Sequence, residues 1–285
     1  MLLLADSGSS KTAWALLDIN KKTIVTKCET IGFNPFHHSE TEILEAIKQN
    51  NQLILYANHI TNIHYFGAGC SSLERCEQMK NILQKFFFQA KIYVKSDLWA
   101  AVLATCGRQK GIVCILGTGS NACFFDGKNI TQHTPALGYI LGDEGSGSYL
   151  GKQLLASFLY KKLPANLQML FEKKYNLHKE NVLNEVYNGT NPKKYLAHFT
   201  HFLDENKENN YIKKLIINSF THFLDIHIKF YLQNSKLLPV HFIGSIAYHF
   251  QDILVEVLQE NNIQAGKILK QPLDELIEHY LNNSI

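Results

Sequence analysis

Short apolar runs that end at polar turns recur along the first part of the chain. The run at residues 2–5 ends at Asp6, a cluster of glycine and serine follows, and a second apolar run covers residues 13–19. Two apolar runs joined by a short turn with glycine predict a β-hairpin. Residues 24–28 fit a third strand, so we expect three neighbouring strands at the start.

Helical and extended patterns then alternate. Residues 41–56 place apolar side chains at helical spacing, with Ser39 or Thr41 as the N-cap. The elements expected next are a strand at 63–68, a helix at 76–88, a strand at 91–95 and a helix at 98–105. This alternation is typical of α/β folds.

The same order starts again after residue 110. Strands are expected at 111–116 and 121–126, and Asp126-Gly127 marks the next turn. An internal duplication is the simplest account of the repeat, with a hinge near residues 105–110. The remaining expected elements are a helical stretch from 152 to 238, a strand at 239–244 and helices at 245–258 and 274–281.

The composition is that of a globular protein of 285 residues, with 46% hydrophobic and 19% charged residues. Its formal charge, 28 − 25 = +3, is too small to indicate nucleic acid or an anionic membrane as a partner. No run of 18 apolar residues predicts a membrane span. The first residues lack the basic segment of a signal peptide. We therefore expect a cytoplasmic protein that binds neither nucleic acid nor membrane.

The cysteines lack the pattern of a disulfide framework or a metal site. None follows residue 123, and no pair has C-x-x-C spacing. We expect reduced and mostly buried thiols. The six are Cys28, Cys70, Cys76, Cys106, Cys114 and Cys123.

The turn after the first strand has the chemistry of a phosphate-binding loop. Small residues and backbone N–H groups let such a turn approach phosphates closely, and a carboxylate there holds Mg²⁺ through water. A Walker A loop is excluded because its spacing is absent, and an ordinary hairpin turn has a similar composition. The residues concerned are Asp6 for the metal and Ser7, Gly8, Ser9, Ser10, Lys11 and Thr12 for phosphate.

A second turn of this kind joins the expected strands at 111–116 and 121–126. It contains Gly117, Thr118, Gly119 and Ser120. Two such loops in the same local setting indicate that both bind one polyphosphate, from opposite sides. Gly244-Ser245, where the strand at 239–244 meets a helix, offers a flat site for adenine. An ordinary turn between a strand and a helix can have the same two residues.

Two further acidic positions carry candidate chemistry. Asp97 lies between a strand and a helix, where an aspartate is either an N-cap or a general base for an attacking hydroxyl. Asp143 and Glu144 lie in a glycine-rich segment that starts at Gly138. Carboxylates there accept hydrogen bonds from sugar hydroxyls, or form a solvated acidic turn before a helix.

Taken in order, these motifs resemble the hexokinase-type members of the actin/hexokinase/Hsp70 superfamily. The residues of these motifs are similar to those of the BadF/BadG/BcrA/BcrD ATPase-like family, and within it to those of N-acetylglucosamine kinases. The most specific signals are Gly-Thr-Gly-Ser-Asn at 117–121 and Gly-Asp-Glu-Gly-Ser at 142–146. The sequence departs from the family pattern at Ser7 and Ser9, and at residues 67–70.

The resemblance implies an actin-like ATPase fold of two ribonuclease H-like domains with a cleft between them. The first would cover residues 1–106, with a C-terminal helix at 272–285 packing back on it. The second would cover 107–271 and carry a helical insertion. The resemblance leaves open whether two copies of the chain form a homodimer.

The resemblance also implies a role for each motif. Asp97 would deprotonate the sugar 6-hydroxyl, the two glycine-containing turns would hold the ATP phosphates, and Asp6 would lie near Mg²⁺. Gly244 and Ser245 would contact adenosine. The implied sugar-binding residues are Asn34, Asp97, Gly138, Asp143 and Glu144.

The function that follows is an ATP-dependent kinase for an N-acetylated amino sugar, with N-acetylglucosamine favoured and N-acetylmuramic acid as the alternative acceptor. An ATPase that activates a radical dehydratase is another alternative, because Cys106, Cys114 and Cys123 lie near the second turn. A non-catalytic regulator that binds sugar or nucleotide is a third.

Overall fold

The computed structural model describes residues 1–8, 10–34, 38–132, 134–233 and 238–282. The chain divides into two compact units. Unit 1 consists of Met1–Gln109 and Gln271–Ile285, and unit 2 is the continuous segment Lys110–Lys270. None of the described helices is long and apolar enough to cross a membrane.

Unit 1 is built on a five-stranded mixed sheet with the order β3-β2-β1-β4-β5. The first three strands are antiparallel neighbours, and β1, β4 and β5 run parallel. The three strands expected at the start of the chain are thus confirmed. The strands are β1 (Leu2–Ser7), β2 (Lys11–Asp18), β3 (Thr23–Ile31), β4 (Asn62–Gly67) and β5 (Lys91–Ser96).

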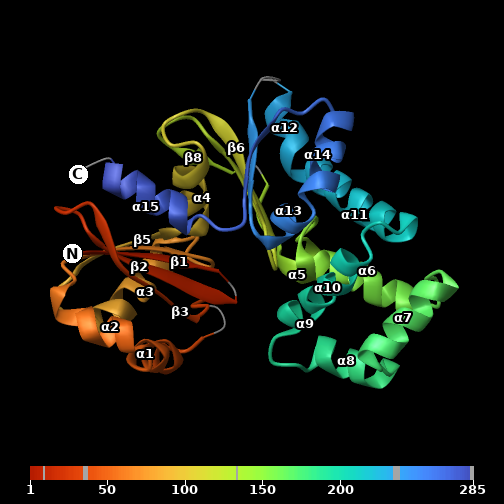
Figure 1. The fold of residues 1–285 in the computed structure, drawn as a ribbon, viewed down its shortest axis with the longest axis horizontal. Coiled ribbons are helices and arrows are strands. Elements are labelled where there is room, and N and C mark those ends of the chain that lie inside the picture. Colours follow the sequence, from red (N-terminus) through yellow and green to blue (C-terminus); the bar gives the residue numbers. More distant parts are fainter. Residues whose placement is uncertain (9, 35–37, 133, 234–237, 283–285) are drawn as a thin grey trace. The chain divides into compact units, whose positions relative to one another are not determined.

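Alternation along β1 sends its side chains to two separate apolar layers. Leu3 and Ala5 pack in one buried cluster, whereas Leu2 and Leu4 pack in another. Helices α1, α2 and α3 cover the first face, and α4 and α15 cover the second (Figure 1). The helices are α1 (Glu40–Lys48), α2 (Asn51–Tyr56), α3 (Leu73–Phe86), α4 (Asp97–Thr105) and α15 (Leu273–Asn282), with a short 3₁₀ turn at Ala57–His59.

Unit 2 repeats the strand plan of unit 1. Its sheet has the order β10-β9-β6-β7-β8, in which β6, β7 and β8 are antiparallel neighbours and β6, β9 and β10 run parallel. The equal order in both sheets agrees with the internal duplication read from the sequence. The strands are β6 (Gly111–Leu116), β7 (Ser120–Phe125), β8 (Ile130–Thr131), β9 (Val240–Ile243) and β10 (Ala265–Leu269).

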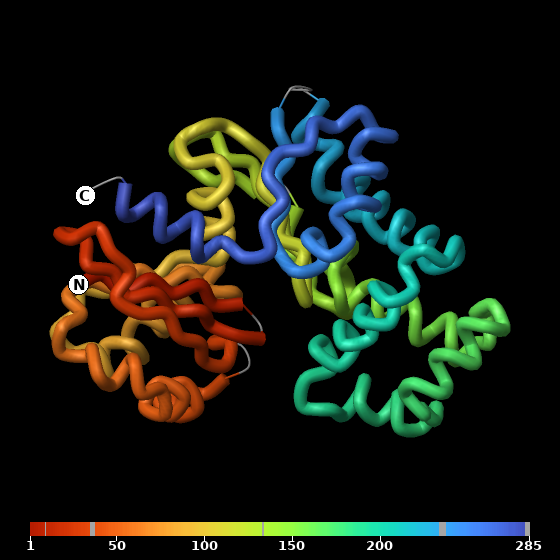
Figure 2. Tube along the Cα trace, viewed as in Figure 1, coloured from red at the N-terminus to blue at the C-terminus, as the bar shows by residue number. Residues whose placement is uncertain are grey.

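A long helical stretch lies between β8 and β9, and Figure 2 follows it from green to blue. Large apolar side chains from these helices form one buried cluster with β6. The helices are α5 (Gly138–Leu141), α6 (Gly147–Leu159), α7 (Ala165–Tyr175), α8 (Lys179–Tyr187), α9 (Pro192–His198), α10 (Thr200–Glu205), α11 (Asn210–Phe223), a π-helix at Leu224–Ile228 and α12 (Lys229–Leu232), and α13 (Ser245–His249) and α14 (Gln251–Glu260) follow β9.

Close packing of α9 on α6 depends on a glycine. A Cβ atom on Gly151 of α6 would lie 1.8 Å from the carbonyl oxygen of Leu196 in α9. Only a residue without a side chain therefore lets the two backbones approach this closely. This contact fixes where α9 lies against α6.

Two predicted helices differ from the structure, and two of its strands were not predicted. The helix expected at 41–56 is two helices, because Asn50 accepts hydrogen bonds from the amides of Gln52 and Leu53 and so caps a new one. Ser39 caps the first with a full capping box. The helix expected at 245–258 is interrupted at Phe250. Strands β8 and β10 were not predicted.

Candidate active site

In unit 1, the acidic residues Asp6 and Asp97 lie at the same edge of the sheet. The register pairs Ser7 with Gly67 and Gly67 with Ser96, so β1, β4 and β5 end side by side. Neighbouring strands are about 4.8 Å apart, which puts about 10 Å between the backbones of β1 and β5. Side chains at these two strand ends are therefore within electrostatic reach of each other.

The pKa of Asp6 records this proximity. Burial raises the pKa of its carboxyl, the charge of Asp97 raises it further, and Lys11 opposes both, so that the pKa is about 7. The residue as a whole is half-buried. Two carboxylates that repel each other in this way form a site that attracts a cation.

Asp97 is not the N-cap of the helix that it begins. The N-cap position of α4 belongs to Ser96, and Asp97 is the first residue of the helix. One of its oxygens accepts a hydrogen bond of 3.0 Å from the amide of Leu98. Negative charge in a first helical turn is favourable, so this position suits a carboxylate that the helix start also orients.

The turn after β1 is closed by a hydrogen bond of 3.0 Å from the amide of Gly8 to the carbonyl of Lys11. Ser10 and Lys11 are exposed, and Lys11 forms an ion pair of 2.5 Å with Glu29. Ser9, the central residue of the predicted phosphate loop, lies outside the described residues. The exposed part of the turn therefore offers backbone groups and one cation.

Ser7 and Thr12, both expected at phosphate, are fully buried. Their hydroxyls lie 2.7 Å apart, and the Ser7 hydroxyl also accepts a hydrogen bond of 3.0 Å from the amide of Phe33. Tyr65 donates a hydrogen bond of 3.1 Å to the carbonyl of Phe33. Strands β1 and β4 thus fix the backbone directly before Asn34, an anchoring role that the sequence analysis missed.

Asn34 is 9% exposed and lies where this anchored backbone turns. Its amide donates to Nδ1 of His38 at 3.3 Å, and the amide of His38 donates to its carbonyl at 2.9 Å. Asn34 is therefore held next to β1, whose end carries Asp6.

In unit 2, the glycine-containing turn after β6 is held by the start of α6. The amide of Gly117 donates to the carbonyl of Gly119 at 3.0 Å. The amide of Gly147 donates to the carbonyl of Gly117 at 2.8 Å, and that of Ser148 to the carbonyl of Thr118 at 3.1 Å. The predicted phosphate loop, residues 117–120, thus has a fixed shape before any ligand arrives.

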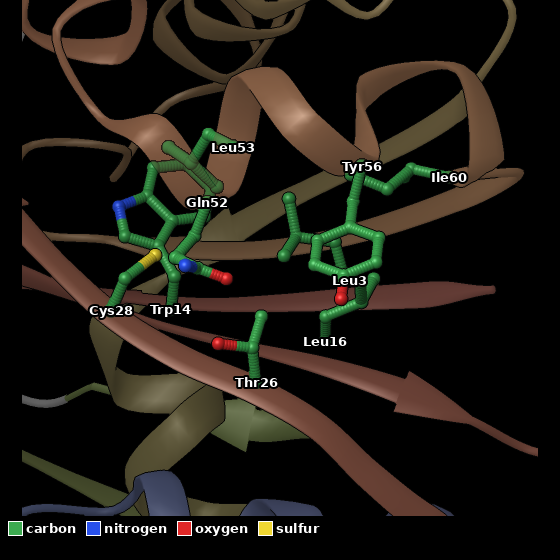
Figure 3. Close-up of a pocket in the computed structure, with 9 residues that line it drawn as sticks. All are labelled: Leu3, Trp14, Leu16, Thr26, Cys28, Gln52, Leu53, Tyr56 and Ile60. Atoms are coloured by element: carbon green, nitrogen blue, oxygen red, sulfur yellow. The ribbon is translucent and has the colours of Figure 1, made fainter.

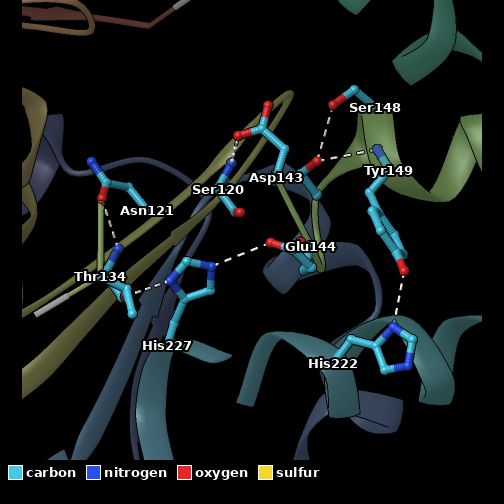
Figure 4. A network of polar contacts seen from close by, with 11 residues as sticks. Ser120, Asn121, Thr134, Asp143, Glu144, Ser148, Tyr149, His222 and His227 are labelled. Carbon is cyan, nitrogen blue, oxygen red and sulfur yellow. Dashed lines mark hydrogen bonds and ion pairs between the residues drawn. The ribbon is translucent and has the colours of Figure 1, made fainter. Parts of the chain in front are cut away.

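The buried carboxylate of Asp143 also contacts this loop (Figure 4). One oxygen accepts a hydrogen bond of 3.2 Å from the amide of Ser120, and the other lies 2.9 Å from Nζ of Lys193. The backbone of Asp143 has a φ of 60°, an uncommon conformation for a residue with a side chain. This strained turn is what directs the carboxylate to the loop.

Glu144 points to a different partner from Asp143. One of its oxygens lies 3.4 Å from Nε2 of the buried His227, whose Nδ1 lies 2.8 Å from the hydroxyl of Thr134 (Figure 4). His227 belongs to the π-helix, a rare element that is frequent at functional sites. The two adjacent acidic residues are therefore fixed by separate networks.

Gly138 starts α5 with a φ of 74°, just before the two acidic residues. Nζ of Lys152 donates to the carbonyl of Tyr139 at 3.1 Å and so ties this short helix to α6. Ile140 and Leu141 are 71% and 74% exposed. The segment predicted to face a sugar therefore has an open apolar side.

The turn at Gly244-Ser245 lies directly beside the glycine loop. Gly244 has a φ of 128°, and a Cβ atom on it would lie 2.2 Å from the carbonyl oxygen of Leu116 and 3.0 Å from the amide of Gly117. Ser245 is exposed. The residues expected at adenosine and at phosphate in unit 2 are thus brought together.

A small space in unit 1 lies away from these residues. It is lined by Leu3, Trp14, Leu16 and other side chains between β1–β3 and α2 (Figure 3). Its volume is about 10 Å³, which is room for one water molecule at most. It is a packing gap and not a substrate site.

No disulfide joins the cysteines of the described residues. Cys106, Cys114 and Cys123 are 7%, 0% and 0% exposed. Burial raises the pKa of Cys114 well above its usual value. These three thiols are therefore poorly placed to hold a surface iron–sulfur cluster.

No family model and no curated relative matches the chain. A solved structure from Porphyromonas gingivalis, provisionally named an N-acetylglucosamine kinase, is 34% identical over 100% of both chains, with a TM-score of 0.90. A protein from Chromobacterium violaceum with the same provisional name is 17% identical over 98% of both chains, with a TM-score of 0.67. A ROK family glucokinase from Streptomyces griseus, solved with glucose and AMPPNP, is 12% identical over 98% of this chain and 97% of its own, with a TM-score of 0.55. The last two likenesses concern the fold alone.

Proposed function

Because the chain belongs to the N-acetylglucosamine kinase-like family of the actin/hexokinase/Hsp70 superfamily, we propose that it transfers the γ-phosphoryl group of ATP to the 6-hydroxyl of an N-acetylated amino sugar. N-acetylglucosamine is the first acceptor to test. The observation that carries the proposal is the pair of coupled carboxylates, Asp6 and Asp97, at one edge of the sheet of unit 1.

Asp97 is the proposed general base. In the reaction, the sugar oxygen attacks the γ-phosphorus, the bond to the bridging oxygen of ADP breaks, and the hydroxyl proton passes to Asp97. A carboxylate held at a helix start is preorganised for this transfer, since Leu98 already orients one of its oxygens. General-base catalysis of this kind contributes about 10²–10⁴-fold in rate.

Asp6 is the proposed partner of the metal. Burial and the charge of Asp97 raise the pKa of Asp6, and a nearby divalent cation would relieve that repulsion, so the residues fit Mg²⁺. Mg²⁺ is usually held by one or two carboxylates, water and substrate phosphates. When bound, Mg²⁺ would neutralise charge on the phosphates.

Unit 2 supplies the proposed nucleotide-binding groups. Gly117 has open space at its Cβ position, so a phosphate can approach the backbone of the loop there. Ser120 Oγ is buried and has no hydrogen-bond partner among the described residues, which supports a ligand next to the loop. Gly244 and Ser245, which lie beside this loop, are the proposed adenosine contacts.

The acceptor is the finer part of the proposal. Asn34, Gly138, Asp143 and Glu144 are proposed to bind its hydroxyl and acetamido groups, together with Asp97. The fixed backbone at Asn34 and the two separately held carboxylates support this assignment. N-acetylmuramic acid differs from N-acetylglucosamine by a lactyl group at C3, and both belong in the test.

The test is ADP release from Mg·ATP by the purified full chain with N-acetylglucosamine, N-acetylmuramic acid, glucosamine, glucose or no sugar. We expect release that depends on an N-acetylated sugar, and a stoichiometric sugar 6-phosphate. Equal, slow release with every addition and with none would contradict the proposal. The matched control is Asp97→Asn, which should bind the sugar but not turn it over.

A further inference from the structure

Lys193 lies against the glycine loop of unit 2, and the proposed function gives it no role. Its Nζ atom is 2.9 Å from the second carboxylate oxygen of Asp143. The side chain of Asp143 is 2% exposed and that of Lys193 is 24% exposed. The pair therefore joins a fully enclosed carboxylate to a cation that still reaches solvent.

The position of Lys193 is set by helix packing. Pro192 opens α9, and Asn191 caps it by accepting a hydrogen bond of 3.0 Å from the amide of Lys194. The glycine contact at Leu196 then fixes α9 against α6, one turn after Lys193. Lys193 is thus held near the loop by the backbone, and only its flexible stem remains to move.

Contact between Lys193 and the loop is direct. A Cβ atom on Gly119 would lie 2.2 Å from Nζ of Lys193 and 2.9 Å from the second oxygen of Asp143. The first oxygen of Asp143 is bonded to the amide of Ser120. Lysine and loop thus share one carboxylate, next to the unpartnered hydroxyl of Ser120.

We propose that Lys193 is a movable cation that leaves Asp143 for the terminal phosphate of the bound nucleotide, and that this move releases Asp143 for the sugar. The proposal rests on the proposed function. A terminal phosphate carries more charge than one carboxylate, so it competes well for a lysine beside it. The second oxygen of Asp143 then accepts a sugar hydroxyl in place of the ammonium group.

The consequence is positive coupling between the two ligands. While Lys193 holds Asp143, the sugar must displace an ion pair, whereas with a nucleoside triphosphate bound the carboxylate is already available. Coupling between sites is typically about 5–150-fold in affinity. If Lys193 only stabilises the loop, the ion pair is kept in every ligand state, and the nucleotide should not change the affinity for the sugar.

The test measures binding by calorimetry with Mg·AMPPNP, Mg·ADP and N-acetylglucosamine, and uses the full chain. The variants are Lys193→Met and the control Lys194→Met, which removes the same charge from an exposed position in the same helix turn. In the parent and in the control, we expect AMPPNP to tighten N-acetylglucosamine binding at least about fivefold. In Lys193→Met, we expect this coupling to vanish and the preference for AMPPNP over ADP to fall about tenfold.

The proposal is overturned if Lys193→Met keeps both the coupling and the preference for AMPPNP over ADP seen in Lys194→Met. If Lys193→Met does not fold, the double variant Lys193→Met/Asp143→Asn removes both charges together. A fall in its preference for AMPPNP over ADP supports the proposal, and an unchanged preference overturns it. If the parent chain binds AMPPNP but none of the sugars, the proposed function fails. The nucleotide preference of Lys193→Met then still supports or overturns the phosphate contact.

Discussion

The negative charge of Asp97 raises the pKa of Asp6, although the two residues follow different strands with β4 between them. Parallel strands that end in register bring this about, because their carboxyl ends meet at one edge of the sheet. The pair gives unit 1 a site with excess negative charge. Two predictions follow from the separate tasks proposed for its members.

Replacement of Asp97 by asparagine keeps the shape of the side chain and removes the base. We expect kcat to fall by about 10²–10⁴-fold, the range for loss of general-base catalysis. The KM for N-acetylglucosamine should change only a few-fold. Steady-state kinetics of ADP release measure both, and near-normal turnover would falsify the assignment of Asp97.

Replacement of Asp6 by asparagine should alter how stability depends on pH. The folded pKa of Asp6 is raised from 3.8 to about 7, so between pH 4 and pH 7 the folded chain binds more protons than the unfolded chain. The free energy of unfolding of the parent therefore falls as pH rises through this window. Denaturant unfolding at pH 5 and pH 8 measures the change.

Asp6→Asn should flatten that dependence, because asparagine does not titrate. The free energy of unfolding of the variant minus that of the parent should therefore be larger at pH 8 than at pH 5. It should also lose Mg²⁺-dependent turnover, if Asp6 is the metal partner. A variant whose unfolding free energy follows the pH curve of the parent would rule out Asp6 as the titrating group.

Replacement of Gly151 by alanine should push α9 away from α6. The added Cβ meets the backbone of Leu196, which cannot swing aside as a side chain does. Overpacking of this kind costs about 1–3 kcal/mol. Denaturant unfolding checks this, with Gln153→Ala, an exposed change in the same helix, as the control. Equal stability of the two variants would mean that the helices separate at no cost.

Replacement of His227 by alanine should loosen the segment that carries Glu144. The histidine lies between Glu144 and Thr134 and is buried, so its loss leaves both without this partner. A buried polar group left unsatisfied costs about 1–3 kcal/mol. We expect the KM for sugar to rise more than kcat falls, because the proposed role of Glu144 is in binding.

His222→Ala is the matched control for that experiment. His222 also contacts a polar side chain, the hydroxyl of Tyr149 at 2.9 Å, but it is exposed and water can replace it. Its sugar KM should stay near that of the parent. The same rise in both variants would point to general damage and not to Glu144.

The sequence predicted most of the secondary structure, since its strands are apolar and end at polar turns. Strands β8 and β10 were not predicted because each lies at an edge of its sheet and is only partly buried, so that neither has a continuous apolar run. The break at Asn50 escaped because a cap inside a helical pattern depends on one side-chain orientation. Both failures concern features that packing decides.

The candidate site could be predicted only where the sequence carries a motif. Asp97 and the loop at residues 117–120 stand out because their neighbours are small or polar in a fixed order. Lys193 gives no such signal, since it lies in a helical stretch that resembles any other and reaches the loop only through the contact of α6 with α9. Ser7 was expected at phosphate, but its hydroxyl is used to anchor Phe33.

The placement of α15 has a consequence for synthesis on the ribosome. This helix covers Leu2 and Leu4 of β1 and is made after all of unit 2. Unit 2 is continuous in the chain and is therefore complete earlier, whereas the part of this apolar face of unit 1 that α4 does not cover stays exposed while more than half of the chain is translated. A growing chain that has not yet reached Leu273 should thus be a preferred client of chaperones, even though its first strands left the ribosome long before.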